Sequence, residues 1–174
     1  THGNFPNQES IERSRRLGVA WDCQIAWHYC DGPALKDVFG PERMKQFLPF
    51  RSMIDGGILV AGGSDHMIRF DSRDAINPYH PFFGMWMAIT RKGSDGSVLT
   101  PEQRITRMEA LKMWTANGAW LSFEEKLKGS IEPGKLADFE VISKDFLICT
   151  EDEIKDIEPL LTAVDGRVVF GKLE

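Results

Sequence analysis

The sequence predicts an α/β fold in which a parallel sheet is followed by a smaller antiparallel sheet. Residues 19–65 follow the pattern strand, helical crossover, strand, and parallel strands need such a long connection. From residue 129 onward the pattern changes to short β segments that end in a hairpin with Asp-Gly at its turn. We therefore expect two units, one over residues 1–128 and the other over residues 129–174.

The composition excludes several classes of function. The 174 residues are 42% hydrophobic and 27% charged, and the formal net charge is -5. Binding of nucleic acid or of an anionic membrane surface depends on clustered Lys and Arg, which this acidic chain does not offer. No apolar run approaches the ~20 residues of a membrane-spanning helix. We therefore expect neither nucleic acid nor a membrane as a partner.

Two further features concern the setting of the chain. The cysteines Cys23, Cys30 and Cys149 are odd in number and lack the spacing of metal ligands, which indicates free thiols in a cytoplasmic protein. The polar start THGNFPNQES is unlike a signal peptide. The chain also opens with Thr1 rather than an initiating Met, and we expect it to begin partway through a longer polypeptide.

The first unit alternates helices and strands up to Asp65. Asn7 is suited to cap its first helix, and Gly18 is suited to stop it. The strand that ends at Asp65 has the sequence ILVAGGSD, a continuous apolar run that meets glycine, as in a strand buried on both faces. In order, the expected elements are a helix over 9–17, a strand over 19–26, a break at 31–33, a helical region over 41–55 interrupted at Pro49, and a strand over 58–65.

A long polar loop, residues 66–81, follows Asp65 and is typical of a functional segment. Thr100 is expected to cap a later helix, because Pro101 suits the first helical position and Gln103 completes a capping box. The other expected elements are a buried helix over 81–89, an apolar helical stripe over 105–114, a helix over 119–126, a short strand near 131, a strand over 137–142, a short helix over 151–157, and hairpin strands over 161–165 and 167–170.

Asp65 is the leading candidate for a functional side chain. It lies where a buried strand ends, and ligands bind at the carboxyl ends of strands in parallel α/β folds. A carboxylate there either caps the turn through an Asx-type hydrogen bond or is compensated by a metal or another cation. Position alone leaves both interpretations open.

Three histidines, His2, His28 and His66, lie near this point of the sequence or of the expected sheet. His2 precedes the first helix and His28 follows the preceding strand, so in a parallel sheet both can converge with Asp65 on one rim. Imidazole and carboxylate are ligands of Zn²⁺ and related divalent metals, which activate water. The simpler alternatives are a stacked structural role for His28, next to Trp27, and a surface position for any lone histidine.

Six stretches of the chain carry a family pattern. They are GGSD at 62–65, the loop residues Asp71, Asn77 and Pro78, AITR at 88–91, LTPEQRITRMEALKMWTANGA at 99–119, GSIEPGKLADFEVI at 129–142, and TAVDGRVVFG at 162–171. This combination resembles the amidohydrolase superfamily, and within it the amidohydrolase-3 group of metal-dependent hydrolases. The resemblance covers nearly all of the chain, and its specificity lies in the combination rather than in any one piece.

The resemblance implies a fold, a reaction and a cofactor. The fold is the C-terminal part of a distorted (β/α)8 TIM-like barrel, over residues 1–128, followed by strands of a small β-sandwich and a closing hairpin, over residues 129–174. The reaction is hydrolysis of an amide-type, non-peptide C–N bond in a small-molecule substrate by metal-activated water. The cofactor is one or two divalent metal ions, expected to be Zn²⁺.

The resemblance also assigns roles by position. Asp65 matches the Asp after barrel strand 8, which helps to bind metal and carries the proton of the attacking water, so it is expected to be both a catalytic residue and a metal ligand. His2 matches the metal-binding His after strand 6, although its two neighbours differ from the family's usual Glu and Ala. His28 and His66 are expected to bind substrate.

Other parts of the family pattern have no counterpart in the chain. These are the HxH pair after strand 1, the Lys or Glu on strand 4 and the His after strand 5. We therefore expect the isolated chain to be incomplete and inactive, and to need the remainder of the barrel or a homo-oligomer. The alternative interpretation is a non-catalytic barrel remnant or interaction module that lacks a complete metal site.

Overall fold

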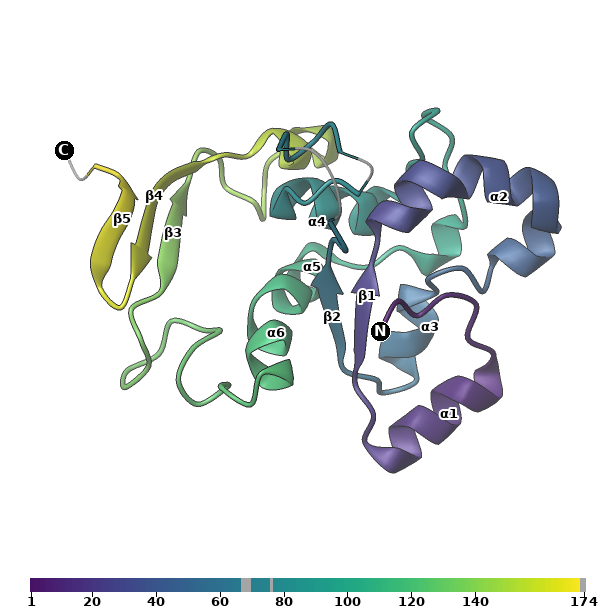
Figure 1. Ribbon diagram of the computed structural model, residues 1–174, viewed down its shortest axis with the longest axis horizontal. Coiled ribbons are helices and arrows are strands. Elements are labelled where there is room, and N and C mark those ends of the chain that lie inside the picture. Colours follow the sequence, from purple (N-terminus) through teal and green to yellow (C-terminus); the bar gives the residue numbers. More distant parts are fainter. Residues whose placement is uncertain (67–69, 76, 173–174) are drawn as a thin grey trace.

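The computed structural model of the chain describes residues 1–66, 70–75 and 77–172. They form a two-stranded sheet of order β1-β2 and a three-stranded sheet of order β3-β4-β5. Figure 1 shows the three-stranded sheet at one end of the molecule, with helices α1, α2 and α3 gathered toward the other end. Of the predicted polar loop, residues 67–69 and 76 lie outside the described residues.

The helices and strands are short and follow one another closely. The α-helices of the described chain are α1 (Gln8–Leu17), α2 (Ala26–Met44), α3 (Phe50–Asp55), α4 (Pro81–Thr90), α5 (Arg107–Trp114) and α6 (Ala116–Leu121). The strands are β1 (Trp21–Gln24), β2 (Val60–Gly63), β3 (Phe139–Ile142), β4 (Pro159–Val164) and β5 (Arg167–Gly171). The 3₁₀ helices are η1 (Pro101–Gln103) and η2 (Glu151–Asp156).

β1 and β2 form the parallel sheet that the sequence predicts. They pair from Trp21 opposite Val60 to Gln24 opposite Gly63, and α2 and α3 lie in the connection between them. A third stretch joins β1 on its other side, since His2 forms a parallel bridge with Cys23. The stretch around His2, β1 and β2 therefore run side by side in the order in which they occur in the chain.

The apolar run before Asp65 is buried as predicted, and its glycines allow close packing. Gly62 of β2 and Gly84 of α4 both face the ring of Trp114 in α5. A Cβ atom added to either glycine would lie 2.7 Å from an atom of that ring. Because neither residue has a side chain, the indole packs directly against the backbone of both elements.

The predicted chain break at 31–33 is wrong. α2 continues through this stretch and changes direction only at Gly40, whose φ is 72°. A Cβ atom at Gly32 would lie 2.6 Å from a methyl carbon of Leu99, so this part of α2 packs closely on another segment. Tertiary packing thus overrides the local signal of the proline. The helical region predicted over 41–55 is divided between the end of α2 and α3.

The predicted helix cap at Thr100 is also wrong. Thr100 has a φ of 50° and is followed only by the 3₁₀ helix η1. Its hydroxyl oxygen instead accepts a 2.8 Å hydrogen bond from the guanidinium of Arg91. The capping box stands at the start of α5, where Thr106 and Glu109 cap each other's backbone N–H groups.

Arg91 connects several segments inside the core. It has no exposed surface, and it donates hydrogen bonds of 3.0 Å to the backbone carbonyls of Phe47 and Leu48. Burial lowers the pKa of its guanidinium to about 9. It lies next to α4, which is buried along almost its whole length, as predicted. None of the described helices is long and apolar enough to cross a membrane.

The C-terminal sheet confirms the predicted hairpin. β4 pairs antiparallel with both β3 and β5, and the turn between β4 and β5 contains Asp165 and Gly166, both with positive φ. The predicted short helix over 151–157 forms as the 3₁₀ helix η2, which packs on α4. Ile154 inside η2 and Ile157 directly after it are fully buried. The predicted strand near 131 is wrong, since that segment contains turns, and the predicted helix over 119–126 is replaced by the shorter α6.

Candidate active site

Asp65 lies on the surface, two residues beyond the end of β2. Its φ of 53° lies in the left-handed region, which Asp adopts more readily than most residues. The side-chain amide of Asn77, which is only 4% exposed, donates a 2.7 Å hydrogen bond to the Asp65 carbonyl. Among the described residues no group donates a hydrogen bond to the carboxylate itself. The Asp65 carboxylate is therefore available to a ligand, and no turn cap is formed by it within this part of the chain.

His2 lies beside the end of β1. Its Nδ1 is 2.9 Å from the amide oxygen of Gln24, and its ring meets the edge of the Trp27 ring, with centroids 5.8 Å apart. An amide oxygen only accepts hydrogen bonds, so this contact matches the tautomer with the imidazole proton on Nδ1. The Nε2 atom of His2 makes no hydrogen bond with any described residue, which leaves its lone pair free.

His28 lies in the first turn of α2 and has no exposed surface. Its ring stacks on that of Phe47, with centroids 6.3 Å apart, and neither ring nitrogen meets hydrogen-bond geometry with a described residue. Burial, and after it the charge of Arg91, hold the pKa of His28 well below its ordinary value, while the nearby Leu99 backbone opposes this shift. The expected substrate contact stays a prediction, and the burial of His28 argues for the structural alternative.

His66 is exposed directly after Asp65. Its backbone N–H donates a 3.2 Å hydrogen bond to the hydroxyl oxygen of Ser64. Its ring lies 4.3 Å from that of Tyr79, centroid to centroid, so the two rings are in contact. His66 is thus on the same rim as Asp65, where a substrate group can reach it, and its substrate-binding role stays a prediction.

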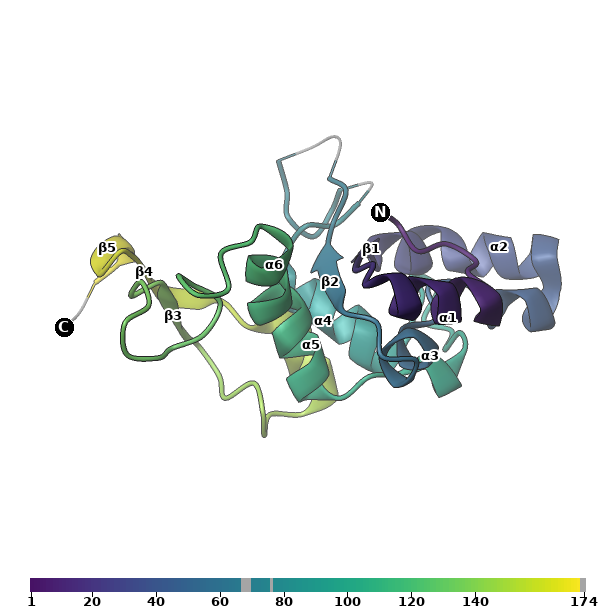
Figure 2. The same ribbon diagram turned by 90° about the horizontal axis from the view of Figure 1, so that it is seen from below.

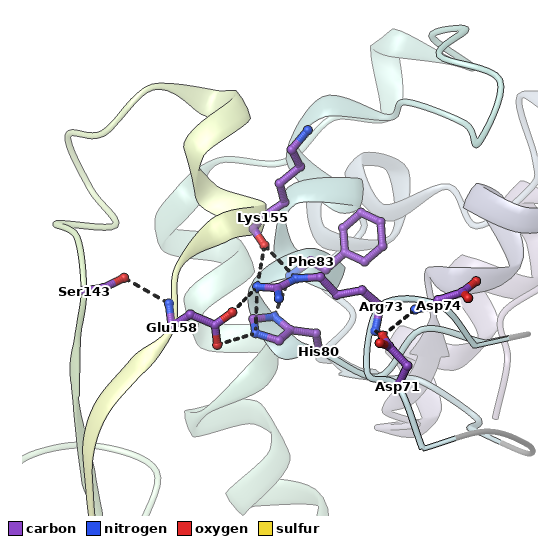
Figure 3. Close-up of polar contacts among 8 residues, drawn as sticks. All are labelled: Asp71, Arg73, Asp74, His80, Phe83, Ser143, Lys155 and Glu158. Atoms are coloured by element: carbon purple, nitrogen blue, oxygen red, sulfur yellow. Dashed lines mark hydrogen bonds and ion pairs between the residues drawn. The ribbon is translucent and has the colours of Figure 1, made fainter. Parts of the chain in front are cut away.

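A polar cluster fastens the loop after β2 to the C-terminal unit (Figure 3). The guanidinium of Arg73 lies 2.5 Å from a carboxylate oxygen of Glu158 and donates to the backbone carbonyl of Lys155 at 3.1 Å and 3.3 Å. The other Glu158 carboxylate oxygen is 3.5 Å from Nε2 of His80. Asp71 accepts hydrogen bonds of 2.8 Å from the backbone N–H groups of Arg73 and Asp74, which shapes the turn that presents the arginine.

The electrostatics of this cluster follow from these contacts. The hydrogen bond from Arg73 lowers the pKa of the Glu158 carboxyl. Burial, followed by the charge of Arg73, lowers the pKa of His80, and Glu158 opposes that shift. His80 also caps α4, since its Nδ1 accepts the Phe83 backbone N–H at 3.4 Å. The cluster therefore holds both the loop and the start of α4 in place.

A small recess of about 250 Å³ opens at the end of β2, between the loop and α4. Its walls include Gly63, Ser64, Tyr79 and His80. Ligand sites usually enclose ~300–1,000 Å³, so this recess by itself is smaller than an ordinary ligand site. Figure 2 shows that the described part of the loop after β2 projects from the body of the molecule.

The sequence interpretation missed Gln24 and the Arg73–Glu158 pair. A signal for Gln24 was present, because a polar residue near the end of the largely apolar stretch VAWDCQIA calls for a partner. No local signal paired the loop residue Arg73 with Glu158, which is 85 residues away. Pairs of that kind depend on how the two units pack.

The donor chemistry of this rim suits a divalent metal in part. His2 has an Nε2 without a hydrogen bond and Asp65 has a carboxylate without one, and imidazole with carboxylate is a common Zn²⁺ ligand set. However, the described part of the chain contains no group of three or more His, Cys, Asp or Glu side chains that could hold a metal ion. The rim therefore offers two ligands at most, and a closed site needs others from elsewhere.

Comparison with known proteins gives a consistent result over the whole chain. The sequence profile described as "Amidohydrolase family" matches residues 1–170. The chain is 32% identical over 174 residues to "Putative amidohydrolase YtcJ" of Bacillus subtilis (98% of this chain, 31% of that protein). It is 38% identical over 131 residues to "N-substituted formamide deformylase" of Arthrobacter pascens (75% and 22%). The chain thus spans less than a third of the length of these relatives.

Solved structures share the fold. An uncharacterized metal-dependent hydrolase from Pyrococcus horikoshii matches with a TM-score of 0.71 at 22% identity, over 87% of this chain and 29% of that one. Atrazine chlorohydrolase TrzN from Arthrobacter aurescens, complexed with zinc, matches with a TM-score of 0.63 at 23% identity, over 98% of this chain and 35% of that one. At these identities the likeness concerns the fold alone.

Proposed function

Because the chain belongs to the amidohydrolase family, we propose that the polypeptide that carries it is a metal-dependent hydrolase of a C–N bond. The substrate is an amide-type small molecule without a peptide bond. One relative is named for removal of the formyl group of N-substituted formamides, which supports this substrate class. Residues 1–128 belong to the barrel of this enzyme and residues 129–174 to its sandwich and closing hairpin.

The observation that carries the proposal is the position of His2 and Asp65 on the two parallel stretches that flank β1. His2 pairs with β1, and β1 pairs with the strand that leads to Asp65. Both side chains keep lone pairs that no described residue occupies. Carboxyl ends of parallel strands are where barrel enzymes place their chemistry, and this geometry therefore supports a ligand site at this rim.

Each residue of the rim has a role in the proposed reaction. One or two divalent ions, Zn²⁺ by preference, would supply Lewis-acid activation of water. His2 holds such an ion through Nε2, and Asp65 holds it through its carboxylate. Asp65 also takes the proton of the attacking water and returns it to the leaving nitrogen, as a general base and then a general acid. His66 contacts the substrate from the loop.

The remaining ligands come from residues outside this chain. They are supplied by a further part of the same polypeptide, or by a second copy of the chain. The isolated 174 residues accordingly lack hydrolase activity, because two ligands bind a metal weakly. The cytoplasmic location expected from the free cysteines stays a prediction.

A non-catalytic interaction module is the second candidate. The absence of a three-ligand group within the described residues favours it, as do the exposed apolar side chains of the C-terminal sheet, among them Leu160, Val169 and Phe170. Such a module would bind no metal at Asp65. The two candidates therefore differ in a measurable property.

The proposal is tested by hydrolysis assays on the purified polypeptide that carries this chain. A panel of small N-substituted formamides and acetamides is incubated with the protein as isolated, after metal removal with a chelator, and after Zn²⁺ is added back. We expect release of amine that the chelator abolishes and that Zn²⁺ restores. Hydrolysis that survives complete metal removal would contradict the proposed mechanism, and no hydrolysis of any amide would favour the interaction module.

A further inference from the structure

Gln24 is a buried polar residue at the end of β1, between His2 on one side and β2 on the other. It is 4% exposed. Among the described residues its side chain makes a single hydrogen bond, at 2.9 Å to Nδ1 of His2. Burial of an amide group costs free energy unless the group forms hydrogen bonds. The bond to His2 is therefore the contact that compensates the burial of Gln24.

The neighbouring strand leaves room for this side chain. Gly63 stands opposite Gln24 in the sheet register. A Cβ atom at Gly63 would lie 3.3 Å from the Gln24 amide nitrogen and 3.2 Å from a carboxylate oxygen of Asp22. Those separations are tighter than most Cβ contacts, so a side chain at position 63 would push the amide away. Gly63 therefore permits the orientation in which Gln24 reaches His2.

The contact between Nδ1 and the amide oxygen matches one tautomer of the imidazole. An amide oxygen only accepts, so the matching neutral ring has its proton on Nδ1 and its lone pair on Nε2. The edge of the Trp27 ring limits rotation of the imidazole on another side. Histidines that bind metals commonly donate their second N–H to a carbonyl or carboxylate, which fixes both tautomer and ring orientation.

We propose that Gln24 is a positioning residue that holds His2 in the Nδ1–H tautomer and presents its Nε2 to a divalent metal. This inference rests on the proposed function, in which His2 is a metal ligand. The alternative is that Gln24 has only a structural role, in packing at the end of the sheet. In that case, replacing Gln24 would lower the stability of the protein but would not change the tautomer of His2.

The test combines a spectroscopic readout with metal binding, in the polypeptide that carries this chain. The variants are Gln24→Met, which keeps the length of the side chain and removes the acceptor, and Gln24→Glu, which restores an acceptor. Gln103→Met is the matched control, because Gln103 is also buried but bonds to Ser52 instead. The ¹⁵N shifts of His2 in the metal-free protein, assigned with His2→Gln, report its tautomer, and a chelator competition titration reports Zn²⁺ affinity.

We expect the Nδ1–H tautomer in the wild type, a mixture of tautomers in Gln24→Met and recovery in Gln24→Glu. We expect Zn²⁺ affinity to fall about 10–100-fold in Gln24→Met and to stay unchanged in Gln103→Met. An Nε2–H tautomer in the wild type would by itself overturn the inference. An unaltered tautomer in Gln24→Met would overturn it as well. If His2→Gln lowers Zn²⁺ affinity but Gln24→Met does not, the inference fails while the proposed function stands. If His2→Gln leaves Zn²⁺ affinity unchanged, the ligand role in the proposed function fails as well.

Discussion

The side-chain amide of Asn77 donates a 2.7 Å hydrogen bond to the backbone carbonyl of Asp65. This bond links the later part of the loop to the residue that directly precedes it, and Asp65 has a φ of 53° there. A non-glycine residue in that region needs such support, because the conformation is intrinsically unfavourable. The direction of the Asp65 carboxylate therefore depends on a residue that makes no bond to the carboxylate itself.

Replacement of Asn77 by Ala should lower Zn²⁺ affinity as well as stability. The Asp65 carbonyl loses its donor, which costs about 0.5–1.5 kcal/mol, and the Asp65 backbone loses the contact that supports its conformation. Asn117→Ala is the control, since the Asn117 amide donates to the Val60 carbonyl, also at 2.7 Å, at the start of the same strand. Urea denaturation and Zn²⁺ titration measure both effects. Equal loss of Zn²⁺ affinity in the two variants would contradict a specific role for Asn77.

Replacement of Arg73 by Met should loosen the loop from the C-terminal unit. The variant loses the ion pair to the half-exposed Glu158 and the bonds to the Lys155 carbonyl, together about 1–2 kcal/mol after allowance for solvent screening. Hydrogen exchange of the Tyr79 and His80 backbone amides, which donate to the Ser72 carbonyl, should become faster. Lys144→Met, which breaks an ion pair within the C-terminal unit, should leave those amides unchanged. Unaltered exchange in Arg73→Met would refute the anchoring role.

Glu109 should make stability depend on acid pH. The hydrogen bond from Arg51, supported by those from Thr106, lowers the pKa of Glu109 to about 2, and burial opposes this shift. The ordinary value, taken for the unfolded chain, is near 4.5. The unfolded state thus binds the proton first, so the stabilisation is complete above pH 4.5 and is lost as the pH falls toward 2. Glu109→Gln should be about 1–2 kcal/mol less stable near pH 7, and the difference should vanish near pH 2. Unfolding free energies across this pH range test it, and a difference that persists at pH 2 would contradict the assignment.

Gly62 should tolerate no side chain. A Cβ atom there would lie 2.7 Å from the Trp114 ring, on the strand that leads to Asp65, and overpacking of this kind costs about 1–3 kcal/mol. Gly118→Ala is the matched control, since a Cβ at Gly118 meets no atom within 4 Å and the residue lies inside α6. Alanine should stabilise that helix by about 0.5–1 kcal/mol. Thermal unfolding of both variants would reveal opposite shifts, and a neutral Gly62→Ala would refute the packing account.

The parallel sheet and the hairpin were predictable because their signals are local. The apolar run ILVAGGSD predicts a buried strand, which is β2. The Asp165-Gly166 pair predicts the hairpin turn between β4 and β5. The errors arose where distant residues decide the outcome. The Thr100 hydroxyl accepts a hydrogen bond from Arg91 instead of capping a helix. The stretch 31–33 stays helical, and this part of α2 packs on Leu99.

The two candidate metal ligands could be named from the sequence, and their role stays a prediction, whereas the contacts that support them could not be predicted. His2 and Asp65 could be named from strand ends and from the family pattern, whereas Gln24 acts through a contact across strands. His28 shows the limit of the reasoning. Its position after a strand suggested the rim, but the first turn of α2 directs it into the core, against Phe47.

The metal content of the Asp65→Asn variant tests the central claim most directly. In the polypeptide that carries this chain, Asn keeps the shape of the side chain but removes the negative charge that a metal ligand supplies. Asp95→Asn is the control, because Asp95 lies in an exposed turn and bonds only to Ser97 among the described residues. By elemental analysis we expect bound Zn²⁺ in the wild type and in Asp95→Asn, and a loss of bound Zn²⁺ in Asp65→Asn. Equal metal content in all three proteins would contradict the account.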